Sequence, residues 1–385
     1  MTTTSVNVAA VAARGSTTAG IQEAIDALPD SGGVVHLPPG RYRLRRSVEL
    51  RSNVTVRGDG PATVITRARP VVVPLTRASD GGRKTVHVER TGGIRPGDEV
   101  YIGDEESLGW WASHCIVREV RDTALRLEIL HGNRKYTFRP NRNARVATWF
   151  PAFWLRDLTG VTIENLTIDG GVKRHRHTIC DFVVAAIHAR GAEHVRITGV
   201  TVRNWSGDGI GLQGGRDAIV SGCVVENCAG HGFHPGTSIT ESLWCNNIAR
   251  GNTRDGLFFC LRVTHSSARG NVLVGNGGHG IGGLTDPDRY NVVTGNVCAE
   301  NGRHGIDADR AVGAVIQGNL CRGNSRSAPG QFAGIYLAGH RDCAVTGNVC
   351  IDDTARPTQR RGLVAIDPVG PNTIADNHCP PSASA

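Results

Sequence analysis

The stretch Asn276-Gly-Gly-His-Gly-Ile281 returns 25 residues later as Asn301-Gly-Arg-His-Gly-Ile306. Working outward from it, a Gly followed by an apolar residue recurs at Gly209-Ile210, Gly232-Phe233, Gly256-Leu257, Gly280-Ile281, Gly305-Ile306, Gly334-Ile335 and Gly362-Leu363. Successive pairs lie 23 to 29 residues apart, and Ala186-Ile187 fits as a degenerate first member. A fixed period of this length is typical of stacked-repeat architectures.

The length of the repeat favours one coil of three short strands, because about 24 residues at roughly 3.3 Å each make one circuit. Stacked coils bury an apolar side that a single coil leaves exposed. A helical repeat is excluded by the recurring Gly-Asn pairs, and a leucine-rich repeat lacks its leucines here. We therefore predict an all-β fold, a right-handed parallel β-helix. Its aligned, inward column should be Ile210, Phe233, Leu257, Ile281, Ile306 and Ile335.

Asparagine and cysteine recur with the same period. One predicted asparagine ladder contains Asn204, Asn227, Asn252, Asn276, Asn301 and Asn324. A second contains Asn271, Asn296, Asn319 and Asn348, each preceded by Gly, and a cysteine ladder contains Cys298, Cys321, Cys350 and Cys379. Stacked side-chain amides bond to one another in such ladders. We expect the cysteines to be buried free thiols.

The chain divides into three predicted parts. Residues 1–70 hold a capping helix over Thr17–Leu28 and the first coils, because apolar residues there follow helical spacing. Residues 71–150 interrupt the repeats, and their alternating stretches predict a small inserted antiparallel β subdomain. Residues 151–385 carry the remaining coils and a C-terminal tail.

Composition narrows the partners. The formal charge is +8 and nearly all of the cationic residues are Arg. The planar guanidinium group of Arg binds carboxylates, sulfates and phosphates through paired hydrogen bonds. This favours an anionic ligand, with Arg-rich codon usage as the alternative. The sequence contains no basic run interleaved with aromatics, so nucleic-acid binding is not predicted. No apolar run is long enough for a membrane span. Eleven cysteines and no apolar leader segment in residues 1–16 predict a cytoplasmic protein, with leaderless export as the alternative.

The repeat carries an unusually polar position beside its Gly-apolar pair. The residues expected to act in catalysis are His231, His234, Asp255, His279, His304 and Asp307. Those expected to bind substrate are His188, Asp208, Arg262, Asp309, Arg310 and Tyr336. Neighbours of an inward apolar residue point outward, so stacking should gather these groups on one face.

Acid–base chemistry is what such a face offers, because imidazole titrates near neutral pH. Proton removal beside a uronate carboxylate needs a base, an acid and a cation that offsets the enolate charge. We expect His234 or His231 as the base, Tyr336 or another His as the acid, and Arg262 or Arg310 as the cation. Asp255 with Asp307 would instead suit a glycosidase. The alternative for any single residue is a turn cap.

No cofactor is expected, although the four histidines His231, His234, His279 and His304 leave a divalent metal as an alternative. The basic run 173–177 is expected to be a solvated loop, or else an anion-binding lip of the groove.

The segment Ile21–Gly40 resembles the N-terminus of the pectin-lyase-like β-helix superfamily, and the coils at 195–379 resemble its alginate-epimerase and periplasmic copper-site-assembly branch. His231-Gly-Phe-His-Pro-Gly236 resembles the Tyr-Gly-Phe-Asp-Pro-His motif of mannuronan C5-epimerases. The family's catalytic Tyr, Asp and His fall on His231, His234 and Gly236, and its further Asp falls on Cys260. Gly278-His279-Gly280 is similar to the Gly-His-Gly of polygalacturonases.

These observations predict a carbohydrate-active enzyme that acts on an acidic, uronate-containing polysaccharide or oligosaccharide by proton abstraction, as an epimerase or lyase. Three alternatives stay open: a glycoside hydrolase or transglycosylase on the same fold, a tailoring or cyclising enzyme for a small metabolite, and a non-catalytic glycan-binding protein. The oligomeric state is left open.

Overall fold

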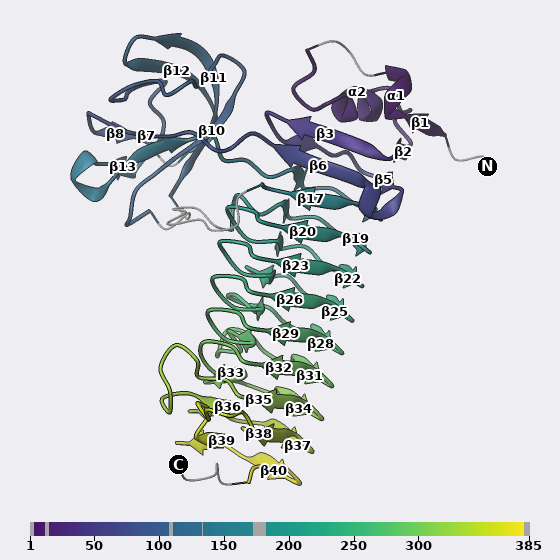
Figure 1. Cartoon of the computed structure of the whole chain (residues 1–385), viewed down its shortest axis with the longest axis vertical. Coiled ribbons are helices and arrows are strands. Elements are labelled where there is room, and N and C mark those ends of the chain that lie inside the picture. Colours follow the sequence, from purple (N-terminus) through teal and green to yellow (C-terminus); the bar gives the residue numbers. More distant parts are fainter. Residues whose placement is uncertain (1–3, 12–14, 108–110, 133, 172–181, 381–385) are drawn as a thin grey trace.

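The computed structural model describes residues 4–11, 15–107, 111–132, 134–171 and 182–380. Its main body is a column of stacked coils, with the N-terminal cap at one end and an inserted subdomain beside the first coils (Figure 1). Three parallel sheets run along the column, and each coil contributes one short strand to each sheet. The predicted parallel β-helix is confirmed.

Sheet A has twelve strands, which are β1 Ser5–Asn7, β2 Gly33–Leu37, β5 Val54–Gly58, β16 Thr162–Glu164, β19 Arg196–Thr198, β22 Ile219–Ser221, β25 Leu243–Cys245, β28 Ser267–Arg269, β31 Val292–Thr294, β34 Val315–Gln317, β37 Cys343–Thr346 and β40 Asn372–Ala375. Sheet B has ten, which are β3 Gly40–Leu44, β6 Thr63–Arg67, β17 Thr167–Asp169, β20 Thr201–Arg203, β23 Val224–Glu226, β26 Ile248–Arg250, β29 Val272–Val274, β32 Val297–Ala299, β35 Leu320–Arg322 and β38 Val349–Ile351. Sheet C has ten, which are β4 Val48–Glu49, β15 Phe153–Arg156, β18 Ile187–Arg190, β21 Ile210–Gln213, β24 Phe233–Gly236, β27 Leu257–Phe258, β30 Ile281–Gly282, β33 Ile306–Asp309, β36 Ala333–Ala338 and β39 Arg361–Ile366.

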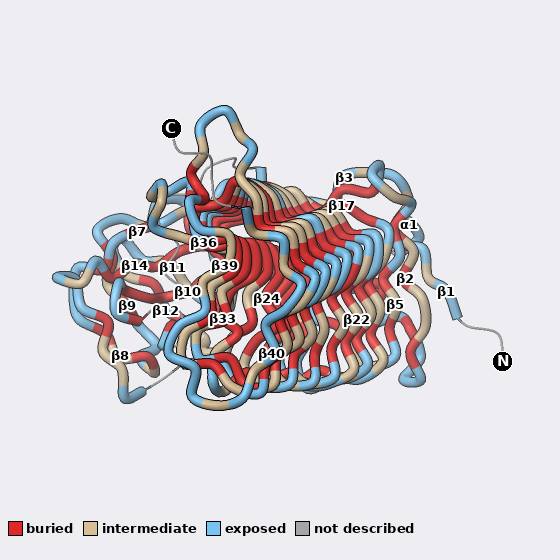
Figure 2. The backbone as a smooth tube through the Cα atoms, turned by 90° about the horizontal axis from the view of Figure 1, so that it is seen from below, coloured by how far each residue is buried: buried red, intermediate tan, exposed pale blue. Residues whose placement is uncertain are grey.

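The apolar member of each Gly-apolar pair lies in sheet C and points into the column. In register from coil to coil, these residues are Ile187, Ile210, Phe233, Leu257, Ile281, Ile306 and Ile335. All are fully buried, and viewed along the column the inner side of the coils behind the exposed last one is a band of buried residues (Figure 2). The predicted inward column is confirmed.

The asparagine ladders form, with one correction. The Nδ2 of Asn252 donates to the Oδ1 of Asn276 at 2.9 Å, and the chain of such bonds continues through Asn301 to Asn324. Asn227 lies outside this ladder, because its φ of 54° places it at the left-handed turn just before it. Cys228 takes the ladder position instead, and its N–H donates to the Oδ1 of Asn252.

Asn204 has the same left-handed φ of 54° and is likewise outside the ladder. In later coils Gly takes that turn position, for instance Gly251 and Gly275. Asn tolerates the left-handed region almost as Gly does, so the prediction was wrong by one residue in the two earliest coils.

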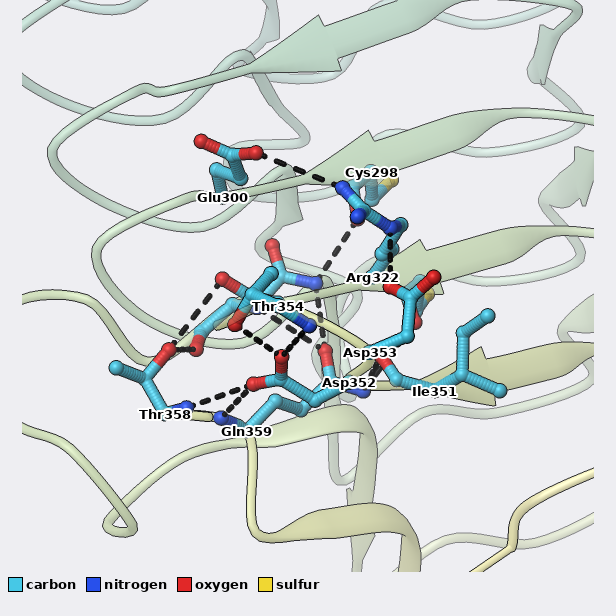
Figure 3. Close-up of polar contacts among 12 residues, drawn as sticks. Cys298, Glu300, Arg322, Ile351, Asp352, Asp353, Thr354, Thr358 and Gln359 are labelled. Atoms are coloured by element: carbon cyan, nitrogen blue, oxygen red, sulfur yellow. Dashed lines mark hydrogen bonds and ion pairs between the residues drawn. The ribbon is translucent and has the colours of Figure 1, made fainter. Parts of the chain in front are cut away.

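The ladder ends on Gln359, whose Oε1 accepts from the Nδ2 of Asn324 at 2.8 Å. Asp352 fixes this end, since its Oδ2 accepts the N–H groups of both Thr358 and Gln359 at 2.7 Å (Figure 3). Beside it, the guanidinium of Arg322 lies between Asp353 and Glu300. The amide ladder is therefore closed by a side-chain amide rather than left with open donors.

The cysteine ladder follows sheet B, where Cys298 is in register with Cys321 and Cys321 with Cys350. All ten described cysteines are free thiols. Burial raises the pKa of Cys223 to about 12, and that of Cys228 to about 12. These thiols are therefore neutral core groups.

The N-terminal cap contains two short helices, α1 Val8–Val11 and α2 Ile21–Asp26. Helix α2 buries Ile21, Ala24 and Ile25 in the main core and covers the end of the stack. It is shorter than the predicted Thr17–Leu28 because Gly20, at φ 86°, precedes it in a left-handed conformation. Within the described ranges no helix is long and apolar enough to cross a bilayer.

The inserted subdomain follows β6, which is joined to β5 through the 3-10 turn η1 Gly60–Ala62. Its six-stranded antiparallel sheet has the order β7 Val72–Pro74, β14 Arg145–Ala147, β10 Glu99–Gly103, β11 Ser113–Arg121, β12 Ala124–His131 and β9 Thr85–His87. A second pair is β8 Ser79–Asp80 with β13 Thr137–Phe138, and η2 Pro140–Arg142 follows. The subdomain has its own apolar cluster.

Polar bonds tie this subdomain to the column. The carboxylate of Glu99 accepts the N–H and the hydroxyl of Ser47 at 2.7 and 2.8 Å, and Arg45 pairs with Asp98 at 2.7 Å. Because Ser47 and Glu99 are both buried, the insert is fixed against the first coils.

Replacing Asn276 by Ala should lower the thermal midpoint by several degrees. The substitution removes the side-chain bonds to Asn301 and to the carbonyl of Ala249. It also removes the acceptor of the buried N–H groups of Asn252. Each stranded buried group costs about 1–3 kcal/mol. Thermal unfolding followed by circular dichroism measures the change. Asn227→Gly is the matched control, because Gly suits its turn, and it should leave the midpoint nearly unchanged. Equal midpoints for both variants would refute a stabilising ladder.

Candidate functional site

The outer face of sheet C carries the candidate site. Its outward column, in register from coil to coil, is Trp154, His188, Gly211, His234, Phe258, Gly282, Asp307 and Tyr336. A second column, just before each sheet C strand, is Asp208, His231, Asp255, His279 and His304. The two columns are neighbours because they lie three residues apart in each coil.

A groove of about 510 Å³ lies over β27 and β30 on this face. Four of the six predicted catalytic residues line it: His231, Asp255, His279 and Asp307. Arg254 and Arg303 line it as well, together with the aromatic ring of Phe258. The groove thus combines predicted imidazoles and carboxylates with two arginines that were not predicted.

Asp255 is the carboxylate at the centre of this set. Its Oδ1 accepts the N–H of His279, and its Oδ2 lies 3.4 Å from Nδ1 of His231. Burial alone would raise the pKa of Asp255, but His231 and the N–H of His279 together lower it below its usual range. Asp255 is therefore ionised at neutral pH. The ring of His231 is held in place by Phe258, stacked at 4.4 Å.

His279 and Asp307 form the second pair, with 3.8 Å between Nε2 and the nearer carboxylate oxygen. Burial raises the pKa of Asp307, and the nearby charges of Asp309 and Asp255 add to the rise. Nδ1 of His279 makes no hydrogen bond to any residue of the described chain. Nδ1 is therefore not used in a structural hydrogen bond.

Gly282 leaves space beside two residues that line the groove, Asp255 and His279. A Cβ at this position would lie 2.9 Å from Oδ2 of Asp255 and 3.4 Å from Cδ2 of His279. In the outward column Gly282 follows Phe258 and lies just before the coil of Asp307. Any side chain here would displace Asp255 or fill the space between the two acid–base pairs.

His234 is placed differently from the prediction. It is only 4% exposed, and it lines neither this groove nor the cavity beside the insert. Its Nδ1 bonds to Oδ2 of the fully buried Asp208 at 2.6 Å. Burial by itself would lower the pKa of His234, but the hydrogen bond and charge of Asp208 raise it to about 9.

His234 is therefore an imidazolium at neutral pH, and a group that already holds its proton does not act as the base. The aromatic rings of Phe182 and Phe258 approach it, at 6.3 and 5.3 Å between centroids. The expectation that it points outward on an open face was wrong, because His234 forms a buried charge pair with Asp208.

Two further histidines of the columns are buried in neutral form. Burial lowers the pKa of His304 to about 3 and that of His188 to about 3. Nδ1 of His304 accepts the N–H of Ala333 at 2.8 Å, and its ring stacks on His279 and Tyr336. His304 supports the groove from the side, and His188 lies in the cavity near the insert.

The remaining predicted binding residues are outside the groove lining. The exposed Arg262 donates to the Ser238 hydroxyl at 2.9 Å, and Arg310 lies 3.6 Å from Asp309 in the turn after β33. Tyr336, half-buried, stacks on His304. The predicted basic loop at 173–177 lies outside the described residues.

The cations that do line the groove, Arg254 and Arg303, were missed by sequence reasoning. The signal was present, because each directly precedes a residue of the polar column. Among the described residues, no group of three or more His, Cys, Asp or Glu is arranged to hold a metal ion.

The comparisons agree with this architecture. Residues 185–350 match the family described as "Right handed beta helix region". No curated protein matches the sequence. The A-module of mannuronan C-5 epimerase AlgE6 from Azotobacter vinelandii is 18% identical, with a TM-score of 0.56, over 98% of this chain and 99% of that chain.

Two other solved structures share the fold at similar distance. An exopolygalacturonase from Thermotoga maritima is 12% identical with a TM-score of 0.52, over 97% of this chain and 91% of that one. PfbA, a surface adhesin of Streptococcus pneumoniae, is 14% identical with a TM-score of 0.54, over 97% and 89%. The chain is thus a right-handed parallel β-helix protein that shares its fold, from cap to last coils, with the A-modules of mannuronan C-5 epimerases.

Proposed function

We propose that the protein is a carbohydrate-active enzyme that takes an acidic, uronate-containing glycan into the groove and abstracts a proton beside the carboxylate, as an epimerase or lyase does. The observation that carries the proposal is the pair of acid–base dyads on one face, His231 with Asp255 and His279 with Asp307. Both dyads line a groove that also holds two arginines.

The spacing of the dyads suits attack from two sides of a sugar ring. His231 and His279 lie two coils apart, which is roughly 10 Å at the strand spacing of parallel sheets. A base and an acid on opposite sides of the reacting carbon are what proton exchange requires. We assign the base to His279, whose Nδ1 makes no hydrogen bond in the described chain and whose Nε2 faces Asp307, and the acid to His231, oriented by Asp255.

Charge in the groove supports an acidic substrate. Removing a proton next to a carboxylate builds negative charge, and Arg254 and Arg303 are the cations that line the site. The ring of His234 lies behind that of His231, with 5.2 Å between the two centroids, and its charge is balanced by Asp208. The fold is shared with a mannuronan C-5 epimerase and an exopolygalacturonase, whose names both denote action on glycans.

One observation favours glycoside hydrolysis as the second candidate. The pKa of Asp255 is lowered and that of Asp307 is raised, so one carboxylate is ionised and the other is more readily protonated. Two carboxyl groups with opposite shifts are the arrangement of a general acid and its partner.

A panel of uronate polymers separates the candidates, because a lyase yields an unsaturated product that absorbs ultraviolet light. An epimerase changes C5 by NMR, and a hydrolase releases reducing ends alone. No change in any polymer would refute both.

Replacing His279 by Gln should reduce kcat/KM by about 100- to 10,000-fold, the usual contribution of a positioned base. His279 is half-buried and unbonded at Nδ1, so the thermal midpoint should move little. Arg262→Gln is the control, because Arg262 is exposed, donates to the Ser238 hydroxyl and lies outside the groove lining. Full activity in His279→Gln would exclude His279 as the base.

The Asp208–His234 pair should shape the dependence of stability on pH. The pKa of His234 is raised to about 9, so its contribution is complete below the unfolded value near 6.5 and is lost as pH rises through 9. The pKa values of His188 and His304 are about 3, so stability also falls as pH drops below about 6.5.

The thermal midpoint should therefore peak near neutral pH. The double variant Asp208→Asn/His234→Gln should lose the decline between pH 6.5 and 9 and keep the acid decline. Midpoints measured from pH 4 to 10 test this, and an unchanged alkaline limb in the double variant would contradict the pairing.

A further inference from the structure

A second cavity, of about 380 Å³, lies where the inserted subdomain meets the first coils of sheet C. We call it the junction cavity. It is lined from the column by Trp154, Arg156, His188, Arg190, Gln213 and Thr237, and from the insert by Tyr101, His114 and His131. Its size is that of a small-molecule site. None of these residues lines the groove proposed above for catalysis.

Two arginines give the junction cavity its charge. Arg156 and Arg190 are in register on the neighbouring strands β15 and β18, so their side chains rise side by side. Neither forms an ion pair with a carboxylate of the described chain, although Asp157 also lines the cavity. The positive charge of the two arginines also affects His131. Burial lowers the pKa of His131, and the charges of Arg190 and Arg156 lower it further. Parallel guanidinium groups are suited to a carboxylate.

Apolar ring faces lie beside these cations. The guanidinium of Arg156 lies 5.1 Å from the ring of Trp154, which packs on His188 at 4.9 Å and on His114 at 5.2 Å. Tyr101 stacks on His114 at 4.5 Å from the other strand of the insert. The cavity thus offers a wall of aromatic surface to one flat face of a ligand.

Buried polar atoms around the junction cavity lack partners. Nε2 of Gln213, Oγ1 of Thr237 and Nδ1 of His114 are all buried without a hydrogen bond in the described chain. An unpaired buried polar group costs about 1–3 kcal/mol, so such groups are rare unless a ligand or water completes them. Three of them around one cavity indicate a ligand with several hydroxyl groups.

His114 is held in position by a hydrogen bond on the side of the insert. Its Nε2 bonds to Oε1 of Glu99 at 2.5 Å, and Glu99 is itself bonded to Ser47. The bond to Glu99 occupies Nε2 and leaves Nδ1 as the ring nitrogen without a partner in the described chain. A hydroxyl that donates to Nδ1 would complete the network.

We propose that the junction cavity binds one carboxylated sugar unit, with its carboxylate on Arg156 and Arg190, its ring against Trp154, and its hydroxyls on Gln213, Thr237 and His114. This site is separate from the acid–base groove and lies on the same face, so it anchors the chain that the groove acts on. The polymer's identity as a uronate glycan rests on the proposed function, whereas the binding of a carboxylated sugar does not.

Direct binding to the full chain tests the proposal. Calorimetry with trigalacturonate and with trimannuronate is compared with the neutral maltotriose. At least one of the acidic trisaccharides should bind, more weakly as salt rises because exposed charges are screened. The double variant Arg156→Gln/Arg190→Gln should weaken that binding by at least about tenfold, the loss of a charge-assisted pair of bonds. Arg262→Gln, an exposed arginine elsewhere, is the matched control and should bind as the wild type.

The outcomes separate the two proposals. Combined with His279→Gln, the arginine double variant should still weaken binding of the acidic trisaccharide, since His279 does not line the junction cavity. Unchanged affinity in the arginine double variant, equal binding of maltotriose, or no binding of either acidic trisaccharide would overturn the junction site. Absence of any reaction with uronate polymers, combined with binding that the double variant loses, would overturn the proposed reaction and leave the junction site standing.

Discussion

Parallel pairing in register, coil upon coil, is the constraint on which the whole molecule depends. Each strand of sheet C begins one coil-length after the previous one, so Phe233 lies on Ile210 and Leu257 on Phe233 without a shift. A one-residue slip would turn the core column outward and the polar columns inward. The amide ladder from Asn252 to Gln359 reinforces this register, because each buried amide bonds to the side chain at the same position of the next coil.

The fold could be predicted because in-register stacking requires similar residues to recur in the sequence at a regular period. The inward column was predicted residue by residue. The asparagine ladder was misassigned only at Asn204 and Asn227, where a left-handed turn accepts Asn as readily as Gly and so imitates the ladder one position early. The shorter helix α2 has a similar local cause at Gly20.

The candidate site was predictable only in part, for a different reason. The repeat specifies which residues leave the column on one face, and His231, Asp255, His279 and Asp307 do share a groove. It does not specify what covers that face. Phe182, from the turn before β18, packs near His234, and Asp208 below it fixes the proton. These contacts join coils through irregular turns, where the period carries no information. Hence a buried ion pair was mistaken for an exposed base.

The coil period also limits how the site can change over evolution. The two acid–base dyads lie on separate coils of one stack, and evolution can add or remove only whole coils. Their separation is therefore quantised in steps of about 4.8 Å, the strand spacing. A lineage that inserts one coil between the coils of Asp255 and His279 would change the reach of the site along the polymer by a whole step, with no intermediate geometry on the way. Only side-chain exchange, as at Gly282, is left for finer adjustment.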